Sequence, residues 1–91
     1  MRRAAKTDAN QREIVNGLRH FGCTVEPLHV VGHGCPDLLI GHHGHTYLLE
    51  VKVAKGALTP DEMNWHEQWR GQVAVVRTLE EALDAVGIRI Q

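Results

Sequence analysis

A short turn near the middle of the chain constrains the fold more strongly than any other stretch of the sequence. Residues 41–44 (GHHG) separate two apolar runs, 37–40 and 45–53. Glycines at such positions supply the backbone conformations of a tight reversal, so this pattern predicts an antiparallel β-hairpin. Side chains alternate across a strand, so the even-numbered residues of the second run are expected on one face and the odd-numbered residues on the other.

The sequence after this hairpin predicts a helix, a strand and a second helix. Residues 59–62 (TPDE) combine an N-cap threonine, a first-turn proline and a glutamate that can close a capping box, and this helix should end at Gly71. The apolar run 73–76 (VAVV) is typical of a strand buried on both faces. Residues 78–87 then predict a last helix. Strand, helix and strand in this order indicate a parallel crossover.

The N-terminal third adds one helix and one strand. Asp8 is a good N-cap with Gln11 to complete a capping box, and apolar residues at helical spacing follow as far as Gly22. Residues 24–31 (TVEPLHVV) predict a strand, and Pro27 places it at an edge or next to a bulge. The expected fold is therefore α/β, in the order α-β-β-β-α-β-α, with a mixed central sheet flanked by helices.

Composition favours a single soluble domain. The chain has 91 residues, of which 43% are hydrophobic and 23% charged, and it contains only two cysteines. We therefore expect one domain over residues 1–91 in a reducing, cytoplasmic compartment, with no membrane span and with residues 1–7 as a flexible basic arm. The net charge is −1, yet residues 1–22 carry five basic side chains against two acidic ones, so this segment could meet phosphate groups.

An acid and a lysine lie two residues apart inside an apolar run. Glu50 and Lys52 should emerge on the same face of their strand, and Asp37 opens the neighbouring strand, where it can lie beside Glu50. Carboxylates suit a hard cation such as Mg²⁺, to which the carbonyl group of Val51 could add an oxygen ligand. The ammonium group could orient an attacking water or stabilise charge on a phosphate. The alternative is a surface ion pair with Asp37 as a turn residue.

The segments that carry these residues resemble the PD-(D/E)XK nuclease signature. They are 34–40 (GCPDLLI) and 49–52 (LEVK), and with the helix entry at 58–60 (LTP) they most resemble the stand-alone VRR-NUC nucleases of phages and bacteria. The resemblance implies a restriction-endonuclease-like core and metal-dependent hydrolysis of phosphodiester bonds. It spans roughly residues 8–86.

The resemblance also assigns roles to individual residues. Asp37 and Glu50 match the metal-binding acids, and Lys52 matches the catalytic lysine. Glu13 matches an acid on the first helix, although an acid early in a helix is also explained by the helix dipole. The position where family members often carry glutamine is Glu62 here, which the capping box already explains, so its role stays open. The ligands expected for Mg²⁺ or Mn²⁺ are Asp37, Glu50, Val51 and Glu13.

These features together predict a DNA endonuclease acting in a bacterial or phage-infected cell. A chain this small supplies little DNA-binding surface, so we expect a homodimer, whose paired sites suit structure-selective cutting of branched DNA such as four-way junctions. The alternative is a non-catalytic nucleic-acid-binding module or assembly subunit with the same fold. The residues expected to contact nucleic acid are Arg2, Arg3, Arg12, His33 and Lys55.

Histidine is the one residue type in excess, with seven copies. His42, His43 and His45 cluster at the hairpin turn, which leaves a small zinc-binding protein as a third hypothesis. Solvent-facing turn residues are the simpler interpretation, because no cysteine pair accompanies them. Trp65 and Trp69 lie four apart on one helical face, which predicts core packing rather than base stacking.

Overall fold

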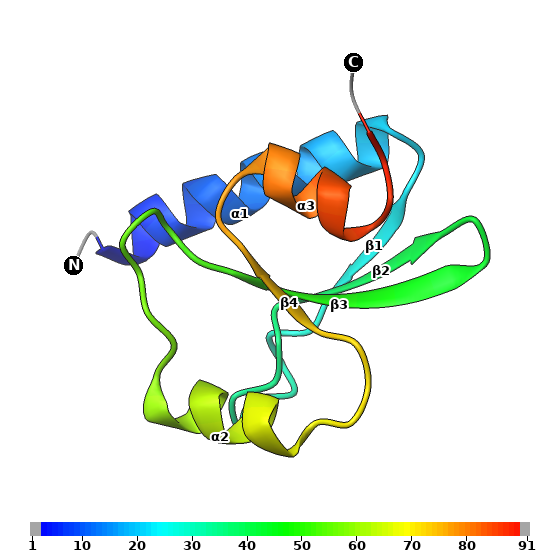
Figure 1. The fold of residues 1–91 in the computed structure, drawn as a ribbon. Coiled ribbons are helices and arrows are strands. Elements are labelled where there is room, and N and C mark those ends of the chain that lie inside the picture. The colour runs from blue at the N-terminus through cyan, green and yellow to red at the C-terminus, as the bar shows by residue number, and fades with distance from the viewer. Residues whose placement is uncertain (1–2, 90–91) are drawn as a thin grey trace.

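The computed structural model describes residues 3–89, and the side chains from residue 8 onward. It contains a four-stranded sheet with α1 and α3 on one face and α2 on the other (Figure 1). This order confirms the expected α-β-β-β-α-β-α arrangement. The elements are α1 (Arg3–His20), β1 (Thr24–Pro27), β2 (Leu38–His42), β3 (His45–Val51), α2 (Pro60–Gln68), β4 (Ala74–Val76) and α3 (Leu79–Ala85).

The sheet is mixed, as the sequence predicts. Its order is β1-β2-β3-β4; β1, β2 and β3 are successively antiparallel, and β4 runs parallel to β3. His42 pairs with His45 across the β2–β3 hairpin, which leaves a two-residue turn. Both turn residues are left-handed, with φ of 50° at His43 and 79° at Gly44. A turn of this handedness matches the twist of the strands it joins.

The apolar core lies between the sheet and the layer formed by α1 and α3. Ile14 and Leu18 of α1 are fully buried, as are Leu38, Ile40 and Leu49 of the central strands. The predicted alternation of faces therefore holds on β3: its odd-numbered residues point into this core. The even-numbered residues Leu48 and Glu50 point to the side of α2.

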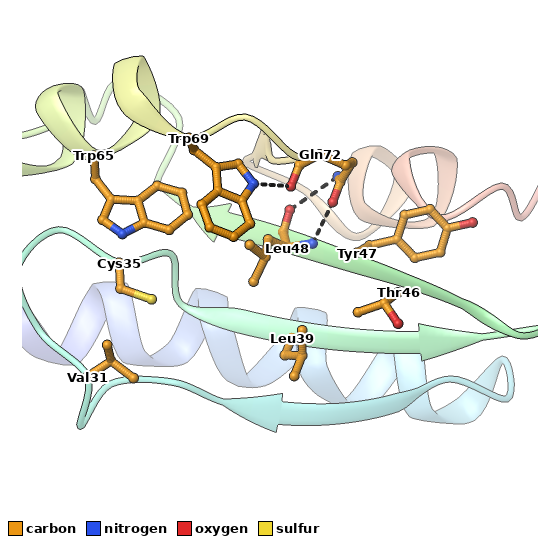
Figure 2. A pocket seen from close by; sticks show the side chains of 9 residues that line it. All are labelled: Val31, Cys35, Leu39, Thr46, Tyr47, Leu48, Trp65, Trp69 and Gln72. Carbon is orange, nitrogen blue, oxygen red and sulfur yellow. Dashed lines mark hydrogen bonds between the residues drawn. The ribbon is translucent and has the colours of Figure 1, made fainter.

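Gln72 completes the open edge of β3 where β4 has not yet begun. Its side-chain amide accepts a hydrogen bond from the Leu48 N–H at 2.6 Å and donates one to the Leu48 carbonyl at 3.3 Å (Figure 2). Its own backbone carbonyl accepts a bond from the Trp69 indole N–H at 3.0 Å. Gln72 thus connects the end of α2 to the middle of β3.

The N-terminal elements differ from the sequence-based expectation at their ends. Helix α1 begins at Arg3, so Asp8 is not an N-cap; residues 3–7 (RAAKT), expected in a basic arm, have helical backbone. Alanine, arginine and lysine favour helix, which allows this extension. Strand β1 ends at Pro27 instead of residue 31. The Leu28 N–H still donates to the Asp37 carbonyl at 2.8 Å, and the chain then turns, with the Val31 N–H donating to the Leu28 carbonyl at 3.0 Å.

The second half also differs in its boundaries and burial. Strand β3 ends at Val51 rather than at Val53, and α2 ends at Gln68. Strand β4 is an edge strand in which only Val76 is buried, so the expected burial on both faces is wrong. Trp65 and Trp69 do not pack into the core, because α2 has no buried residue and Trp69 is 43% exposed. No helix of the described chain is both long and apolar enough to cross a bilayer.

Candidate active site

The hairpin brings Asp37 to the strand that carries Glu50. Asp37 lies directly before β2, and its Oδ2 accepts a hydrogen bond from the Val51 N–H at 2.7 Å. The N–H and C=O groups of one strand residue point to the same side, so the Val51 carbonyl is also directed to the side of Asp37. Glu50 is 1% exposed and lies on the face of the sheet that α2 covers. Three of the four expected ligands, Asp37, Glu50 and Val51, therefore lie next to one another where β3 ends and β2 begins.

Glu50 is held in a setting that disfavours its charge. Burial raises its pKa to about 9, with further contributions from the charges of Asp37 and Glu62 that exceed the opposing effect of Lys52. Its Oε1 is buried and has no hydrogen-bond partner in the structure described. A buried acceptor without a donor costs free energy, and a bound cation would remove both this cost and the repulsion between carboxylates.

Lys52 lies between two glutamates. Its Nζ is 2.7 Å from Oε1 of Glu62 and 3.6 Å from Oε2 of Glu50. Burial would lower the pKa of Lys52, but the hydrogen bond and charge of Glu62, together with Glu50, outweigh burial and raise it. The lysine is therefore a permanently charged donor at neutral pH.

The capping box of α2 positions Glu62. Its backbone N–H donates to Oγ1 of Thr59 at 3.2 Å, and its Oε1 accepts from the Thr59 N–H at 2.9 Å. The oxygen that closes this box is also the one that binds Lys52. Burial would raise the pKa of Glu62, but the bonds from Lys52 and Thr59 lower it. Sequence reasoning left this residue without a site role, although its place in the first turn after the Lys52 strand was a usable signal.

The loop before Asp37 rests on the start of α2. Gly34 has φ of +82°, and a Cβ there would lie 2.4 Å from the backbone oxygen of Asp61. Pro36 is fully buried. From the other side of the sheet, Asn10 of α1 donates to the Lys52 carbonyl at 3.0 Å. The site is thus fixed by the hairpin, by α2 and by α1.

A structural comparison identifies the fold on which this site is built. A solved structure titled "VRR_NUC domain" matches with a TM-score of 0.72 and 24% identity, over 89% of this chain and 94% of that one. The chain has the VRR-NUC fold. This is the restriction-endonuclease-like fold that the signature at residues 34–52 implies. No protein-family model and no curated protein matches the sequence.

Within the VRR-NUC fold, Glu13 does not join the other acids. It is exposed on α1, while Asn10 is the residue of this helix that bonds to the end of β3. Among the described residues, no group of three or more histidine, cysteine or acidic side chains is placed to hold a metal ion. The donors that fit a cation are therefore the carboxylates of Asp37 and Glu50 with the Val51 carbonyl, and water would complete a Mg²⁺ shell.

Three of the five residues expected to contact nucleic acid lie at the described surface of the protein. Arg12, His33 and Lys55 are exposed, whereas Arg2 and the side chain of Arg3 lie outside the described part of the chain. At the hairpin, the rings of His42 and His43 stack with centroids 4.1 Å apart. Stacked rings do not converge their nitrogens on one point, which gives the zinc hypothesis no support.

Proposed function

We propose that the protein is a metal-dependent endonuclease that hydrolyses phosphodiester bonds in DNA. The observation that carries this proposal is the buried, unpartnered Glu50 oxygen beside Asp37 and Lys52 on a VRR-NUC fold. A purely structural role does not account for this group, because an acid with a pKa of about 9 in the folded chain lowers stability at neutral pH, where the unfolded chain releases the proton that the folded chain keeps.

Asp37, Glu50 and the Val51 carbonyl would hold Mg²⁺ or Mn²⁺. When bound, such an ion acidifies water and neutralises phosphate charge. Hydrolysis forms a bond from a water oxygen to phosphorus, breaks the bond from phosphorus to one ester oxygen, and delivers a proton to that leaving oxygen. Lys52 stays protonated, so it orients the water and stabilises the phosphate charge instead of acting as the base.

Cleavage assays with variants of the site test this proposal. Linear, flapped and four-way-junction DNA would be incubated with Mg²⁺, Mn²⁺ or EDTA. We expect metal-dependent cutting that Asp37→Asn and Lys52→Ala each reduce at least about a hundred-fold. Asp84→Asn, at an exposed acid on α3, which lies on the opposite face of the sheet from α2, is the matched control. Binding without cutting in either metal would contradict an enzyme and favour a non-catalytic DNA-binding module.

Selectivity for branched DNA and a homodimeric state belong to the same proposal. The chain measures about 34 × 32 × 22 Å, and its described residues bring Asp37, Glu50 and Lys52 together in one candidate site. One such unit covers at most about one turn of duplex, so two units with a two-fold axis suit paired nicks across a junction. We expect analytical ultracentrifugation to give twice the 10.2 kDa chain mass. A monomer that nicks junctions and linear duplex equally would contradict both expectations.

The proposal places the enzyme in the cytoplasm of a bacterial or phage-infected cell. Its support is the resemblance to phage and bacterial VRR-NUC nucleases in the segments 34–40 and 49–52.

A further inference from the structure

Helix α2 presents two rows of side chains outside the core. Trp65 and Trp69 stack on each other with centroids 4.6 Å apart and ring planes 21° from parallel. Beside them Gln68 donates a hydrogen bond from its Nε2 to Oδ1 of Asn64 at 3.3 Å. Each row follows the i, i+4 spacing of a helix, so indole and amide groups lie next to each other along α2.

The indoles are anchored on the side that faces the sheet. Figure 2 shows both rings between α2 and the strands, with Trp65 above Cys35, Trp69 next to Leu48 and the Trp69 N–H bonded to Gln72. This side is an apolar pocket of about 530 Å³. The packing fixes the orientation of the rings, although Trp69 remains 43% exposed. A rigid, partly exposed indole is a preformed stacking surface.

A polar hollow lies on the other side of the indole pair. It has a volume of about 300 Å³, and it is lined by His33, Asn64, Trp65, Gln68 and Trp69. We call it the α2 hollow. The bond between its two amides leaves the Asn64 N–H donors and the Gln68 carbonyl oxygen without partners in the described structure. Adjacent amide donors and acceptors match the edges of nucleobases, and indole faces match their planes.

The α2 hollow is coupled to the candidate active site by two short connections. Glu62 precedes Gln68 by six residues on α2, which is about 9 Å along a helix axis. His33 lies in the same loop as Asp37, and the contact of Gly34 with Asp61 fixes this loop on α2. Neighbouring phosphates advance about 3.4 Å along a duplex strand and farther when extended. A base two or three nucleotides from the cleaved phosphate would thus be within reach.

We propose that the α2 hollow binds an unpaired nucleobase of the DNA strand that enters the active site. This inference rests on the proposed nuclease function and narrows its substrate to DNA with unstacked bases near the cut. A base inside a duplex has both of its faces covered and its pairing edge occupied, so only a displaced base can stack on Trp69 and bond to Asn64 and Gln68. Branch points and flaps supply such bases.

The two tryptophans make this inference directly measurable. They are the only tryptophans of the chain, so its intrinsic indole fluorescence arises at the α2 hollow. A short single-stranded deoxyoligonucleotide would be titrated into the protein in EDTA, and again with Ca²⁺ in place of Mg²⁺. The comparison probe has the same backbone length but abasic sites. We expect quenching by the first probe and little by the second, because stacking requires the base.

Variants on α2 test the amides separately from the fold. We expect Asn64→Ala with Gln68→Ala to weaken the base-dependent binding about ten-fold. Both side chains are exposed and alanine favours helix, so the fold should remain, which circular dichroism checks. Met63→Ala, at a residue of the same helix that is 58% exposed and outside the hollow, should leave binding unchanged.

The outcomes separate this inference from the nuclease proposal. Equal quenching by the abasic probe, no quenching in either buffer, or unchanged binding in the double variant would overturn the base site. If metal-dependent cleavage accompanies any of these results, the nuclease proposal is supported and only the base site is contradicted. Base-dependent quenching without cleavage in any metal would support the base site and contradict the nuclease.

Discussion

At the scale of single residues, Glu50 determines how this protein responds to pH and to metal ions. The pKa of its carboxyl group is raised from 4.5 to about 9, first by burial and then by Asp37. Between pH 4.5 and about 9, Glu50 therefore keeps its proton in the folded chain and releases it in the unfolded chain. Without a cation, the contribution of Glu50 to the free energy of unfolding should be greatest below about pH 4.5. This contribution should fall as the pH rises toward 9.

Replacing Glu50 by glutamine should remove this dependence. Glu50→Gln keeps the shape of the protonated acid, so we expect a higher melting temperature than the parent at pH 8 in EDTA, and a flatter profile between pH 5 and 9. Thermal melts at several pH values measure both. Mg²⁺ should stabilise the parent and leave the variant unchanged, because the cation would replace the proton on Glu50. A variant that melts lower than the parent at pH 8 would contradict this account.

Glu62 should act on cleavage through Lys52. Glu62→Gln retains an oxygen for the capping box but loses the charge that holds the ammonium group, so we expect cleavage to fall about ten-fold with helix content unchanged. The pH–rate profile should shift as well, because the pKa of Lys52 loses its main support.

A glutamate elsewhere in the chain provides the control for this change. Glu81 occupies the same position of α3, with Thr78 as its N-cap, and it bonds to the Arg77 N–H at 2.7 Å. Glu81→Gln should leave cleavage intact. Equal losses in both variants would indicate a general effect of capping rather than a role in the site.

Strand alternation was enough to predict part of this site from the sequence. Glu50 and Lys52 share a face because they are two residues apart on a strand, and the hairpin returns Asp37 to them. The role of Glu62 depends on how far the crossover after β3 carries α2 across the sheet, which residue spacing does not encode. The exposure of Glu13 follows from the rotation of α1, whose buried face is set by Ile14 and Leu18.

At the scale of elements, the loop between β1 and β2 and the start of α2 form one unit. Gly34 has a left-handed backbone, and its Cα approaches the Asp61 carbonyl so closely that no Cβ fits. The loop at 32–36 is recognisable in the sequence from its two glycines and its proline. Its partner is not, because the contact joins segments separated by more than twenty residues and leaves no periodic pattern.

Two glycines of this loop allow the contact to be measured. Gly34→Ala should destabilise the fold by about 2–4 kcal/mol, since it adds a clash to the left-handed backbone strain. Gly32→Ala has a similar φ of +72° but nothing within 4 Å of the added Cβ, so it should cost only about 1 kcal/mol. Denaturant unfolding gives both free energies. Equal costs would show that the loop does not pack on α2 in solution.

At the scale of the whole molecule, the two faces of the sheet differ in how deeply their residues are buried. The face under α1 and α3 holds the buried core, whereas α2 covers the other face without burying a single residue of its own. The order of elements predicted from the sequence contains both layers. The sequence does not reveal that only one face of the sheet carries a buried core. Two tryptophans four residues apart are typical of a helix that faces a core, yet Trp65 and Trp69 line surface pockets.

Neighbouring leucines on β3 test this division. Leu49 is fully buried in the core, so Leu49→Ala should cost about 2–5 kcal/mol of unfolding free energy. Leu48 points to the α2 side and is only partly buried, so Leu48→Ala should cost less than half as much. Paired denaturation curves decide the matter. A larger loss of unfolding free energy for Leu48→Ala than for Leu49→Ala would contradict a main core between the sheet and helices α1 and α3.

The side chain of Gln72 also has a consequence for behaviour at high concentration. Strand β4 is only three residues long and pairs with β3 from Leu49 onward. The backbone of β3 before Leu49 would otherwise have unpaired groups to which a strand from another chain could bind. By bonding to both the N–H and the carbonyl of Leu48, the glutamine amide occupies the place of a peptide group there. We therefore expect this one polar side chain to hinder edge-to-edge aggregation at Leu48, where β4 does not extend the sheet.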